Sequence, residues 1–262
     1  MKTYKKELEN ALKAAELAKR EVLKFYKSKQ YNIETKEDNS PVTDADKAVD
    51  KIIKDYLSKK YPDHGFLTEE SVDNKERLNK EYVWIIDPID GTDSFIDGRD
   101  DFSTLIALCR NHEIVVAVIS VPAKGEVYFA SKWQGAFKQN KNFEVKQIHR
   151  NLKSKNLILV KSPHHVTSAD EQLYEKNKDK FSKVEIVGSA YKMALIAEGK
   201  AEVTFKLSAG SKEWDIAAPS LILKEAGALL LTPDKEKYTF NKQDVVNHKG
   251  YIVVNRKKNF LN

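Results

Sequence analysis

The sequence predicts an α+β fold, and three observations support that prediction. Apolar side chains recur at helical spacing through about the first 28 residues, short runs of β-forming residues follow between residues 82 and 130, and strand-like and helix-like segments alternate from residue 157 onward. Apolar residues make up 41% of the 262 residues. That composition supplies a sizeable core and excludes collagen-like, low-complexity and wholly disordered chains.

Two helices are expected near the N-terminus. The first covers about residues 1–28, with apolar side chains at Tyr4, Leu8, Leu12, Ala15, Val22 and Tyr26. The second begins after Thr43, because Thr43 and Asp46 have the spacing of a capping box at a helix start. Pro62 ends this helix, and its expected apolar stripe is Ala48, Ile52, Ile53, Tyr56 and Leu57.

The middle of the chain predicts one sheet. Tyr82–Ile86 is a continuous apolar run that ends at Asp87-Pro88, as expected of a buried central strand. Three short strands separated by turn residues follow, and they predict an antiparallel meander that continues the same sheet: Leu105–Leu108, Ile114–Ser120 and Glu126–Ala130.

The last part of the chain is expected to alternate strands and helices. The segments are Leu157–Val160, Lys192–Glu198, Ala201–Lys206, Ile216–Ala226, Ala228–Thr232 and Tyr251–Asn255. The polar segment Gln147–Lys155 is the best boundary between two α+β halves. We therefore expect an N-terminal half over residues 1–150 and a C-terminal half over residues 151–262.

Charge and cysteine content narrow the classes of function. The 45 basic and 39 acidic residues give a net charge of +6, but the lysines are dispersed among acids. This favours a solvated surface, with a nucleic-acid or polyanion-binding protein as the alternative class. A single cysteine, Cys109, cannot form an internal disulfide and favours the cytoplasm. The longest apolar stretch, Ile114–Val121, is far shorter than the ~20 residues that span a bilayer, so no membrane partner is expected.

Carboxylates occur at four places where burial patterns would not put them. Glu69-Glu70 follow an apolar pair, Asp87 and Asp90 stand just beyond the buried strand, and Asp46 and Asp215 each begin an apolar helix. Each has an ordinary alternative: a solvated loop for Glu69-Glu70, a turn for Asp90-Gly91, and a helix cap for Asp46 or Asp215.

The segment Asp87–Thr92 is the hardest of these to explain as ordinary structure. Pro88 holds Asp87 extended, and the turn that follows can aim the Ile89 carbonyl in the same direction as the carboxylates of Asp87 and Asp90. Oxygen donors without Cys or His suit Mg²⁺ or Mn²⁺ and disfavour zinc. Mg²⁺ held by few carboxylates keeps positions for water and phosphate oxygens, which indicates phosphoryl chemistry.

Three blocks in register resemble the signatures of the inositol monophosphatase superfamily: Glu69-Glu70, Trp84–Thr92 and Trp214–Ala218. Pro41–Asp46 matches the upstream block of the same superfamily. The resemblance implies an α/β/α/β/α layered sandwich and a Mg²⁺-dependent, commonly lithium-sensitive phosphomonoesterase. It also implies a small phosphorylated substrate as partner and either a monomer or a homodimer. The dispersed lysines and the acid cluster argue against a nucleic-acid partner.

The resemblance carries roles onto residues of this chain. It implies two or three Mg²⁺ ions, with Mn²⁺ as a substitute, held by Glu69, Glu70, Asp87, the Ile89 carbonyl, Asp90 and Asp215. Thr92 and Asp46 would orient and deprotonate the attacking water. The backbone N–H groups of Gly91 and Thr92, at a helix start, could bind the phosphate.

Two further segments, Gly188–Lys192 and Ala209–Asp215, resemble the 3'(2'),5'-bisphosphate nucleotidases, as does Lys36–Pro41. That likeness implies hydrolysis of the 3'-phosphate of adenosine 3',5'-bisphosphate, a by-product of sulfate assimilation. Lys192 would pair with the phosphate that is not hydrolysed, and Ser189 and Ser162 would lie beside the substrate.

The chain also departs from the nucleotidase pattern. Asp93 stands where that group carries Lys, and a proline shifts the histidine in Lys161–His165. The stretch Phe95–Leu108, which includes Thr104–Leu108, also resembles histidinol-phosphate phosphatases of the same superfamily. Inositol 1-phosphate and histidinol phosphate therefore stay open as alternative substrates. For His164 and His165, a role at the surface or at the edge of the substrate is favoured over metal binding.

Overall fold

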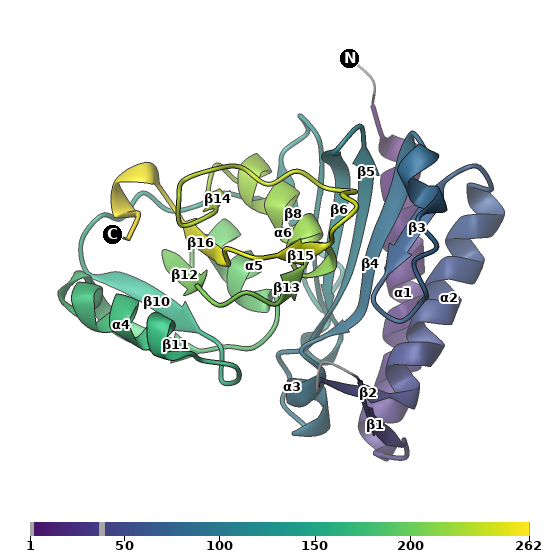
Figure 1. Ribbon diagram of the computed structural model, residues 1–262, viewed down its shortest axis with the longest axis horizontal. Coiled ribbons are helices and arrows are strands. Elements are labelled where there is room, and N and C mark those ends of the chain that lie inside the picture. The colour runs from purple at the N-terminus through teal and green to yellow at the C-terminus, as the bar shows by residue number, and fades with distance from the viewer. Residues whose placement is uncertain (1–2, 37–39, 262) are drawn as a thin grey trace.

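Two β-sheets alternate with three layers of helix in the computed structural model, which describes residues 3–36 and 40–261 (Figure 1). The larger sheet has seven strands in the order β3-β4-β5-β6-β7-β8-β9, and the smaller has five in the order β11-β10-β12-β16-β14. Helices α1 (Lys5–Ser28) and α2 (Asp44–Lys60) cover one face of the larger sheet. Helices α5 (Tyr191–Ala197) and α6 (Glu213–Glu225) lie between the sheets, and α4 (Ser168–Asn177) covers the outer face of the smaller one. The predicted layered α/β/α/β/α fold is confirmed.

The strand bounds follow the chain in order. The larger sheet consists of β3 (Gly65–Thr68), β4 (Tyr82–Asp90), β5 (Ser103–Arg110), β6 (Glu113–Val121), β7 (Glu126–Ser131), β8 (Ala136–Gln139) and β9 (Val145–Ile148). The smaller sheet consists of β10 (Leu157–Lys161), β11 (Phe181–Ile186), β12 (Val203–Lys206), β14 (Leu229–Leu231) and β16 (Tyr251–Val254). Two short pairs stand apart: β1 (Ile33–Thr35) with β2 (Pro41–Thr43), and β13 (Ser211–Lys212) with β15 (Val246–Asn247).

The N-terminal helices form largely as predicted. The capping box is present: Thr43 Oγ1 and the Thr43 N–H both donate to Asp46, and the Ala45 N–H donates to Thr43 Oγ1. The predicted stripe of α2 was partly wrong, since Ala48, Ile52 and Tyr56 are only half-buried. The fully buried positions are Ala45, Val49, Ile53 and Leu57, which recur every four residues and so form a single row facing the sheet.

Strand β4 is buried on both faces, as its continuous apolar run predicts. Val83 and Ile85 pack on the side of α5 and α6, while Trp84 and Ile86 pack on the side of α1 and α2. The strand runs to Asp90 rather than ending at Ile86 as predicted, because pairing with β5 resumes at Asp90 after a register shift.

The predicted meander is confirmed as β5, β6 and β7, and two further strands, β8 and β9, extend it. In the C-terminal part the six predicted elements form, but α4 and β11 were missed. Strand β11 is an edge strand with mostly exposed side chains, so its sequence lacks a clear apolar pattern. The last strand of the larger sheet ends at Ile148, and the first strand of the smaller sheet begins at Leu157. One hydrophobic core nevertheless contains residues of both sheets, so the division of the chain at residue 150 stays a prediction.

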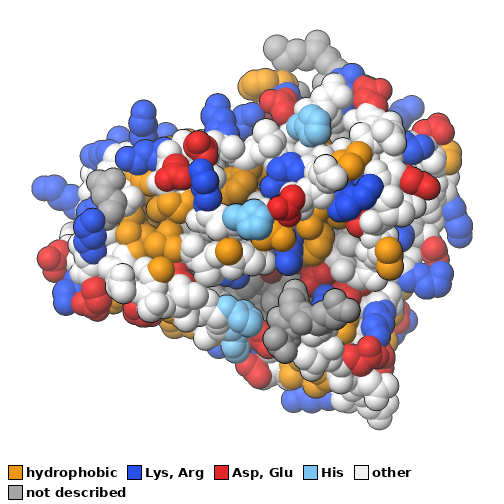
Figure 2. Space-filling model, viewed as in Figure 1, with side chains coloured by type: hydrophobic (Ala, Val, Ile, Leu, Met, Phe, Trp, Pro, Cys, Tyr) orange, Lys and Arg blue, Asp and Glu red, His pale blue; other side chains and the backbone are white. Residues whose placement is uncertain are grey.

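The surface charge, the polarity of the helices and the single cysteine bear on the class of protein. Lysine and arginine side chains are interspersed with acidic ones over the face shown in Figure 2. Across residues 3–36 and 40–261, the helices are too short or too polar to cross a membrane. Cys109 is buried and carries a free thiol.

Candidate active site

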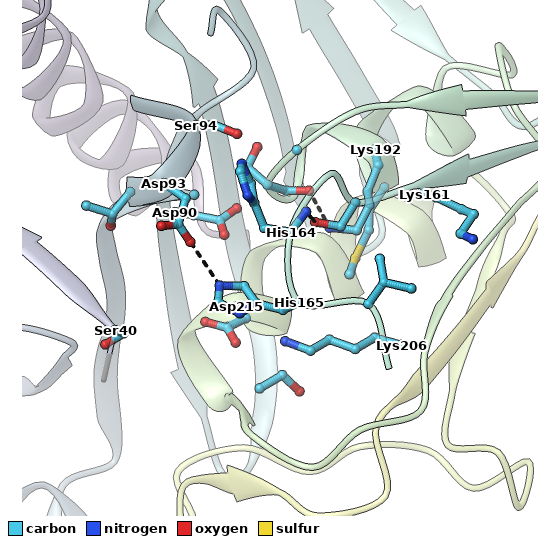
Figure 3. Close-up of a pocket in the computed structure, with 18 of the residues that line it drawn as sticks. Ser40, Asp90, Asp93, Ser94, Lys161, His164, His165, Lys192, Lys206 and Asp215 are labelled. Atoms are coloured by element: carbon cyan, nitrogen blue, oxygen red, sulfur yellow. Dashed lines mark hydrogen bonds and ion pairs between the residues drawn. The ribbon is translucent and has the colours of Figure 1, made fainter. Parts of the chain in front are cut away.

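A cavity opens between the end of β4, helix α3 (Thr92–Ile96), and the segments that lead into α4, α5 and α6. It is lined by residues from both sheets, and Figure 3 shows acidic and basic side chains projecting into it. Figure 2 shows histidine side chains beside a hollow on this face of the molecule. Of the predicted site residues, those that line the cavity are Glu69, Asp90, Gly91, Thr92, Ser162, Ser189, Lys192 and Asp215.

Asp87 and Asp90 lie at the end of β4, where the ladder with β5 shifts register around Pro88. Asp87 is 2% exposed, and its Oδ1 atom is buried without a hydrogen-bond partner among the described residues. Burial raises the pKa of Asp87 well above its usual range, and the charges of Glu69, Asp90 and Asp215 raise it further. Asp90 Oδ2 accepts hydrogen bonds from Ser103 Oγ at 3.0 Å and from the Ala190 N–H.

Asp215 lies in the first turn of α6, where its Oδ2 atom accepts a hydrogen bond from the Lys212 N–H at 2.8 Å. The residue therefore caps its helix, as the ordinary alternative predicted, and also lines the cavity. Burial raises the pKa of Asp215 to about 7, and the charges of Asp90 and Glu69 contribute in the same direction.

Glu69 and Glu70 follow β3 and share one cation. Lys36 Nζ lies 2.8 Å from Glu69 Oε1 and 2.6 Å from Glu70 Oε1. Burial raises the pKa of Glu70 to about 7 despite this ion pair. Burial alone would lower the pKa of Lys36, but the two carboxylates raise it above its usual value. The sequence had indicated Lys36 only as part of a likeness to nucleotidases, and residues 37–39 of that segment lie outside the described part of the chain.

The donor set at this place fits a hard divalent cation. The carboxylates of Glu69, Asp87, Asp90 and Asp215 repel one another at the buried end of β4, and Asp87 Oδ1 has a free lone pair. As the side chains stand in residues 3–36 and 40–261, no three Asp, Glu, His or Cys side chains form a ready-made metal-binding group. Instead, the carboxylates of Glu69, Asp90 and Asp215 make the hydrogen bonds and ion pairs described above. An oxygen-only set of this kind suits Mg²⁺ or Mn²⁺.

Thr92 and Asp46 meet beside these carboxylates. Thr92 Oγ1 lies 3.3 Å from Asp46 Oδ1 and 3.1 Å from the Ile89 carbonyl oxygen. Burial raises the pKa of Asp46 to about 6. The structure therefore brings the two residues of the predicted water-orienting pair together.

Gly91 precedes α3 and has a φ of +85°, a conformation that favours glycine. A Cβ atom at this position would lie 3.1 Å from Ser189 Cβ. The loop after β4 thus packs closely against the segment that leads into α5.

The predicted substrate residues of the C-terminal half already make contacts within the protein. Lys192 Nζ donates a hydrogen bond to the Ser189 carbonyl at 2.7 Å, and Ser189 Oγ donates to the Asp101 carbonyl at 2.6 Å. Burial lowers the pKa of Lys192, whereas the charge of Asp90 acts in the opposite direction. Ser162 Oγ accepts a weak hydrogen bond of 3.3 Å from the His164 N–H.

Sequence reasoning did not select Lys206, which ends β12 and extends into the cavity (Figure 3). Its charge acts on both Lys192 and Asp215. The available signal was its place at the end of a predicted strand, beside the sheet edge where ligands collect.

Two histidines that line the cavity pair with acidic side chains in or just after α3. His165 Nε2 lies 2.9 Å from Asp93 Oδ2, and His164 Nε2 lies 3.4 Å from Asp97 Oδ2. Both pairs join the segment after β10 to α3 or to the residue that follows it. This placement agrees with the expected role at the edge of the substrate, which stays a prediction.

Comparisons with known proteins identify the family of the chain. A profile of the inositol monophosphatase family matches residues 4–260. The chain is 32% identical over 233 residues to the 3'(2'),5'-bisphosphate nucleotidase CysQ of Haemophilus influenzae, covering 88% of this chain and 86% of that protein. It is 33% identical over 230 residues to an inositol monophosphatase of Dictyostelium discoideum, covering 86% and 84%.

A solved structure supports the same assignment. The crystal structure of CysQ from Bacteroides thetaiotaomicron, described as a bacterial member of the inositol monophosphatase family, matches with a TM-score of 0.83 and 31% identity, covering 96% of this chain and 98% of that one. The family profile spans almost the whole chain, and the fold agrees with it. The chain therefore belongs to the inositol monophosphatase family and is a phosphatase.

Proposed function

We propose that the protein is a Mg²⁺-dependent phosphomonoesterase that removes the 3'-phosphate of adenosine 3',5'-bisphosphate, releasing AMP and phosphate. The observation that carries the proposal is the Thr92–Asp46 contact, set beside buried carboxylates that repel one another. A buried cluster of acids would repel a phosphate ester unless a cation intervened. Two or three metal ions are proposed, with Mn²⁺ as a substitute.

The residues that would hold the metal are those at the end of β4 and around it: Glu69, Glu70, Asp87, the Ile89 carbonyl, Asp90 and Asp215. When bound, Mg²⁺ would make water more acidic and stabilise the leaving alkoxide. Lys36 forms ion pairs with both Glu69 and Glu70. It would therefore have to move away from these carboxylates before they bind Mg²⁺.

Thr92 and Asp46 would handle the proton of the attacking water. Thr92 Oγ1 accepts a hydrogen bond from the water while it donates its own proton toward Asp46 Oδ1. A pKa of about 6 leaves Asp46 mostly ionised at neutral pH yet able to accept a proton, which suits a general base. The N–H groups of Gly91 and Thr92 at the start of α3 would bind phosphate oxygens.

Cations that line the cavity support a substrate with two phosphates. Lys206 and Lys192 line the same cavity as Thr92, and so do Ser162 and Ser189. We assign the second phosphate to Lys206 together with Lys192, which has further N–H groups beyond the one bonded to Ser189.

Asp93 favours a second candidate substrate. Its carboxylate lines the rim, paired with His165, where it could bind the ammonium group of histidinol phosphate. The nucleotide is preferred because Lys206 and Lys192 project into the cavity as well.

A side-by-side assay separates the candidates. Phosphate release is measured at equal concentrations of adenosine 3',5'-bisphosphate, inositol 1-phosphate and histidinol phosphate, with saturating Mg²⁺. We expect the largest kcat/KM for the bisphosphate. Weak activity on it beside strong activity on either monophosphate would overturn the substrate assignment and leave the phosphatase assignment intact.

A further inference from the structure

Asp101, which follows α3, is bonded to a segment of the cavity wall that is far away in the sequence. The residue is 4% exposed. Its Oδ2 atom accepts hydrogen bonds from the Gly188 N–H at 2.8 Å and from Arg99 Nη2 at 2.6 Å, and its Oδ1 atom accepts one from Arg99 Nε at 3.2 Å. Its backbone carbonyl accepts the 2.6 Å hydrogen bond from Ser189 Oγ. The side chain of Asp101 thus bonds Gly188 and its backbone carbonyl bonds Ser189, two consecutive residues that precede α5.

The fit at this junction is close. A Cβ atom on Gly188 would lie 2.5 Å from Ser94 Oγ and 3.1 Å from Asp101 Oδ1, so only glycine allows the segment to approach α3 this closely. Ser189 has a φ of +51°, a left-handed conformation that a non-glycine residue adopts at an energetic cost and keeps only when its neighbours hold it. The bonds from Asp101 supply that restraint.

The segment held by Asp101 leads to Lys192 and, like Lys192, lines the cavity. The Ser189 carbonyl accepts the hydrogen bond from Lys192 Nζ, and the Ala190 N–H donates to Asp90. A shift of Gly188 and Ser189 would therefore move Lys192 within the cavity.

Asp101 is held as an anion. Burial acts to raise its pKa, but hydrogen bonds from Arg99, the Gly188 N–H and Ser94 outweigh burial and keep the pKa below its usual value. Arg99 reaches Asp101 in a two-bond fork, the geometry in which arginine binds carboxylates most strongly.

We propose that Asp101 is a positioning residue, which together with Arg99 fixes Gly188–Lys192 against α3 and so sets the affinity for the substrate without touching it. The inference rests on the proposed function for its link to substrate affinity. Its structural part, the restraint on Gly188–Lys192, stands on the contacts alone.

The first test is kinetic and compares Asp101→Asn with Asp100→Asn. The control removes the same charge from the next residue, whose side chain is 62% exposed and paired with Lys124. For Asp101→Asn we expect KM for adenosine 3',5'-bisphosphate to rise about tenfold, as for loss of a hydrogen bond to a charged group, with kcat within about threefold of wild type. A larger effect on KM than on kcat is expected because Asp101 does not contact Thr92 or Asp46, the proposed catalytic pair. A KM equal to that of Asp100→Asn, or a fall in kcat alone, would overturn the proposal.

The second test needs neither substrate nor metal. Amide hydrogen exchange is followed in the peptide that spans residues 187–193, and exchange about tenfold faster than in wild type is expected for Asp101→Asn alone. Equal exchange in the two variants would overturn the restraint. If wild-type protein does not hydrolyse the bisphosphate, the proposed substrate fails, while the exchange result still decides the restraint.

A further variant covers the case in which Asp101→Asn does not fold, as judged by circular dichroism. Arg99→Gln leaves the carboxylate and its backbone bond in place and removes the charged fork. Relative to Asp100→Asn, Arg99→Gln is then expected to raise KM and to speed amide exchange in residues 187–193. Both effects should be smaller than those expected for Asp101→Asn. No difference between Arg99→Gln and Asp100→Asn in exchange would contradict the proposal.

Discussion

Thr92 Oγ1 lies 3.3 Å from Asp46 Oδ1, although the two residues lie in the first turns of different helices, α3 and α2. The two oxygens of Asp46 have separate partners. Oδ2 accepts hydrogen bonds from the Thr43 N–H at 2.8 Å and from Thr43 Oγ1 at 2.6 Å, and Oδ1 faces Thr92. The capping box therefore orients the carboxylate that the proposed mechanism uses, so helix capping and catalysis are compatible in one residue.

This pair gives the first prediction. Thr92→Ala and Asp46→Asn should each lower kcat by about 10²- to 10³-fold, because each interrupts the path of the proton from water. The double variant should be little worse than either single one, since both remove the same step. Thr92→Ser keeps the hydroxyl and is the matched control. Losses that simply multiply in the double variant would show that the two residues do not act as a unit.

The second prediction concerns the carboxylates at the proposed metal site. Asp90→Asn and Asp215→Asn should each lower turnover by several orders of magnitude and weaken Mg²⁺ binding measured by calorimetry, while the fold is kept. Asp244→Asn removes an exposed acid that pairs with His248 and should change neither quantity. Turnover like that of wild type in Asp90→Asn or Asp215→Asn at saturating Mg²⁺ would count against the metal assignment.

The third prediction is a dependence of stability on pH in metal-free protein. Burial raises the pKa of Asp215 from 3.8 to about 7, so the folded state binds a proton that the unfolded state has already lost between those pH values. The favourable contribution is present at low pH and is lost as the pH rises through 7, because the ionised group is then buried among like charges.

Asp215→Asn isolates this effect, because asparagine resembles the protonated acid at every pH. Without metal, its Tm should exceed that of wild type by more at pH 8 than at pH 5, because wild type loses stability as the pH rises from about 4 to about 7. With Mg²⁺ at pH 8 the order should reverse, since only wild type keeps the full ligand set. A Tm difference that is the same at pH 5 and pH 8 without metal would disprove the raised pKa.

The fourth prediction tests the second phosphate. Lys206→Ala and Lys192→Ala should each raise KM for adenosine 3',5'-bisphosphate more than KM for inositol 1-phosphate, because only the nucleotide offers a phosphate beyond the reacting one. Lys180→Ala, which removes an exposed lysine outside the cavity lining, is the control. Equal effects on both substrates would remove these lysines from that role.

Much of the fold could be predicted because local patterns and burial agree. The run in β4 is apolar throughout, since alternate residues enter two different cores, and the Thr43–Asp46 spacing marks the start of α2. Strand β11 and helix α4 could not be recognised, because β11 is an exposed edge strand and α4 buries few of its side chains. Their positions depend on the sheet beside them rather than on their own sequence.

The candidate site could be predicted where a motif carries the chemistry locally, as in Asp87–Thr92. Contacts between distant segments could not. Lys36 bonding Glu69 and Glu70 requires the end of β1 to be placed beside the end of β3. Lys206 entering the cavity and Asp101 holding Gly188 require the two sheets to be placed relative to each other. Sequence spacing carries no information on such pairs unless the whole fold is known.

The most direct test of the central claim is phosphate release from adenosine 3',5'-bisphosphate by wild-type protein, first stripped of metal with a chelator and then titrated with Mg²⁺. We expect hydrolysis to be lost after chelation and to return with added Mg²⁺. Undiminished hydrolysis under exhaustive chelation would contradict the claim that the buried acids around Asp87 act through a divalent cation.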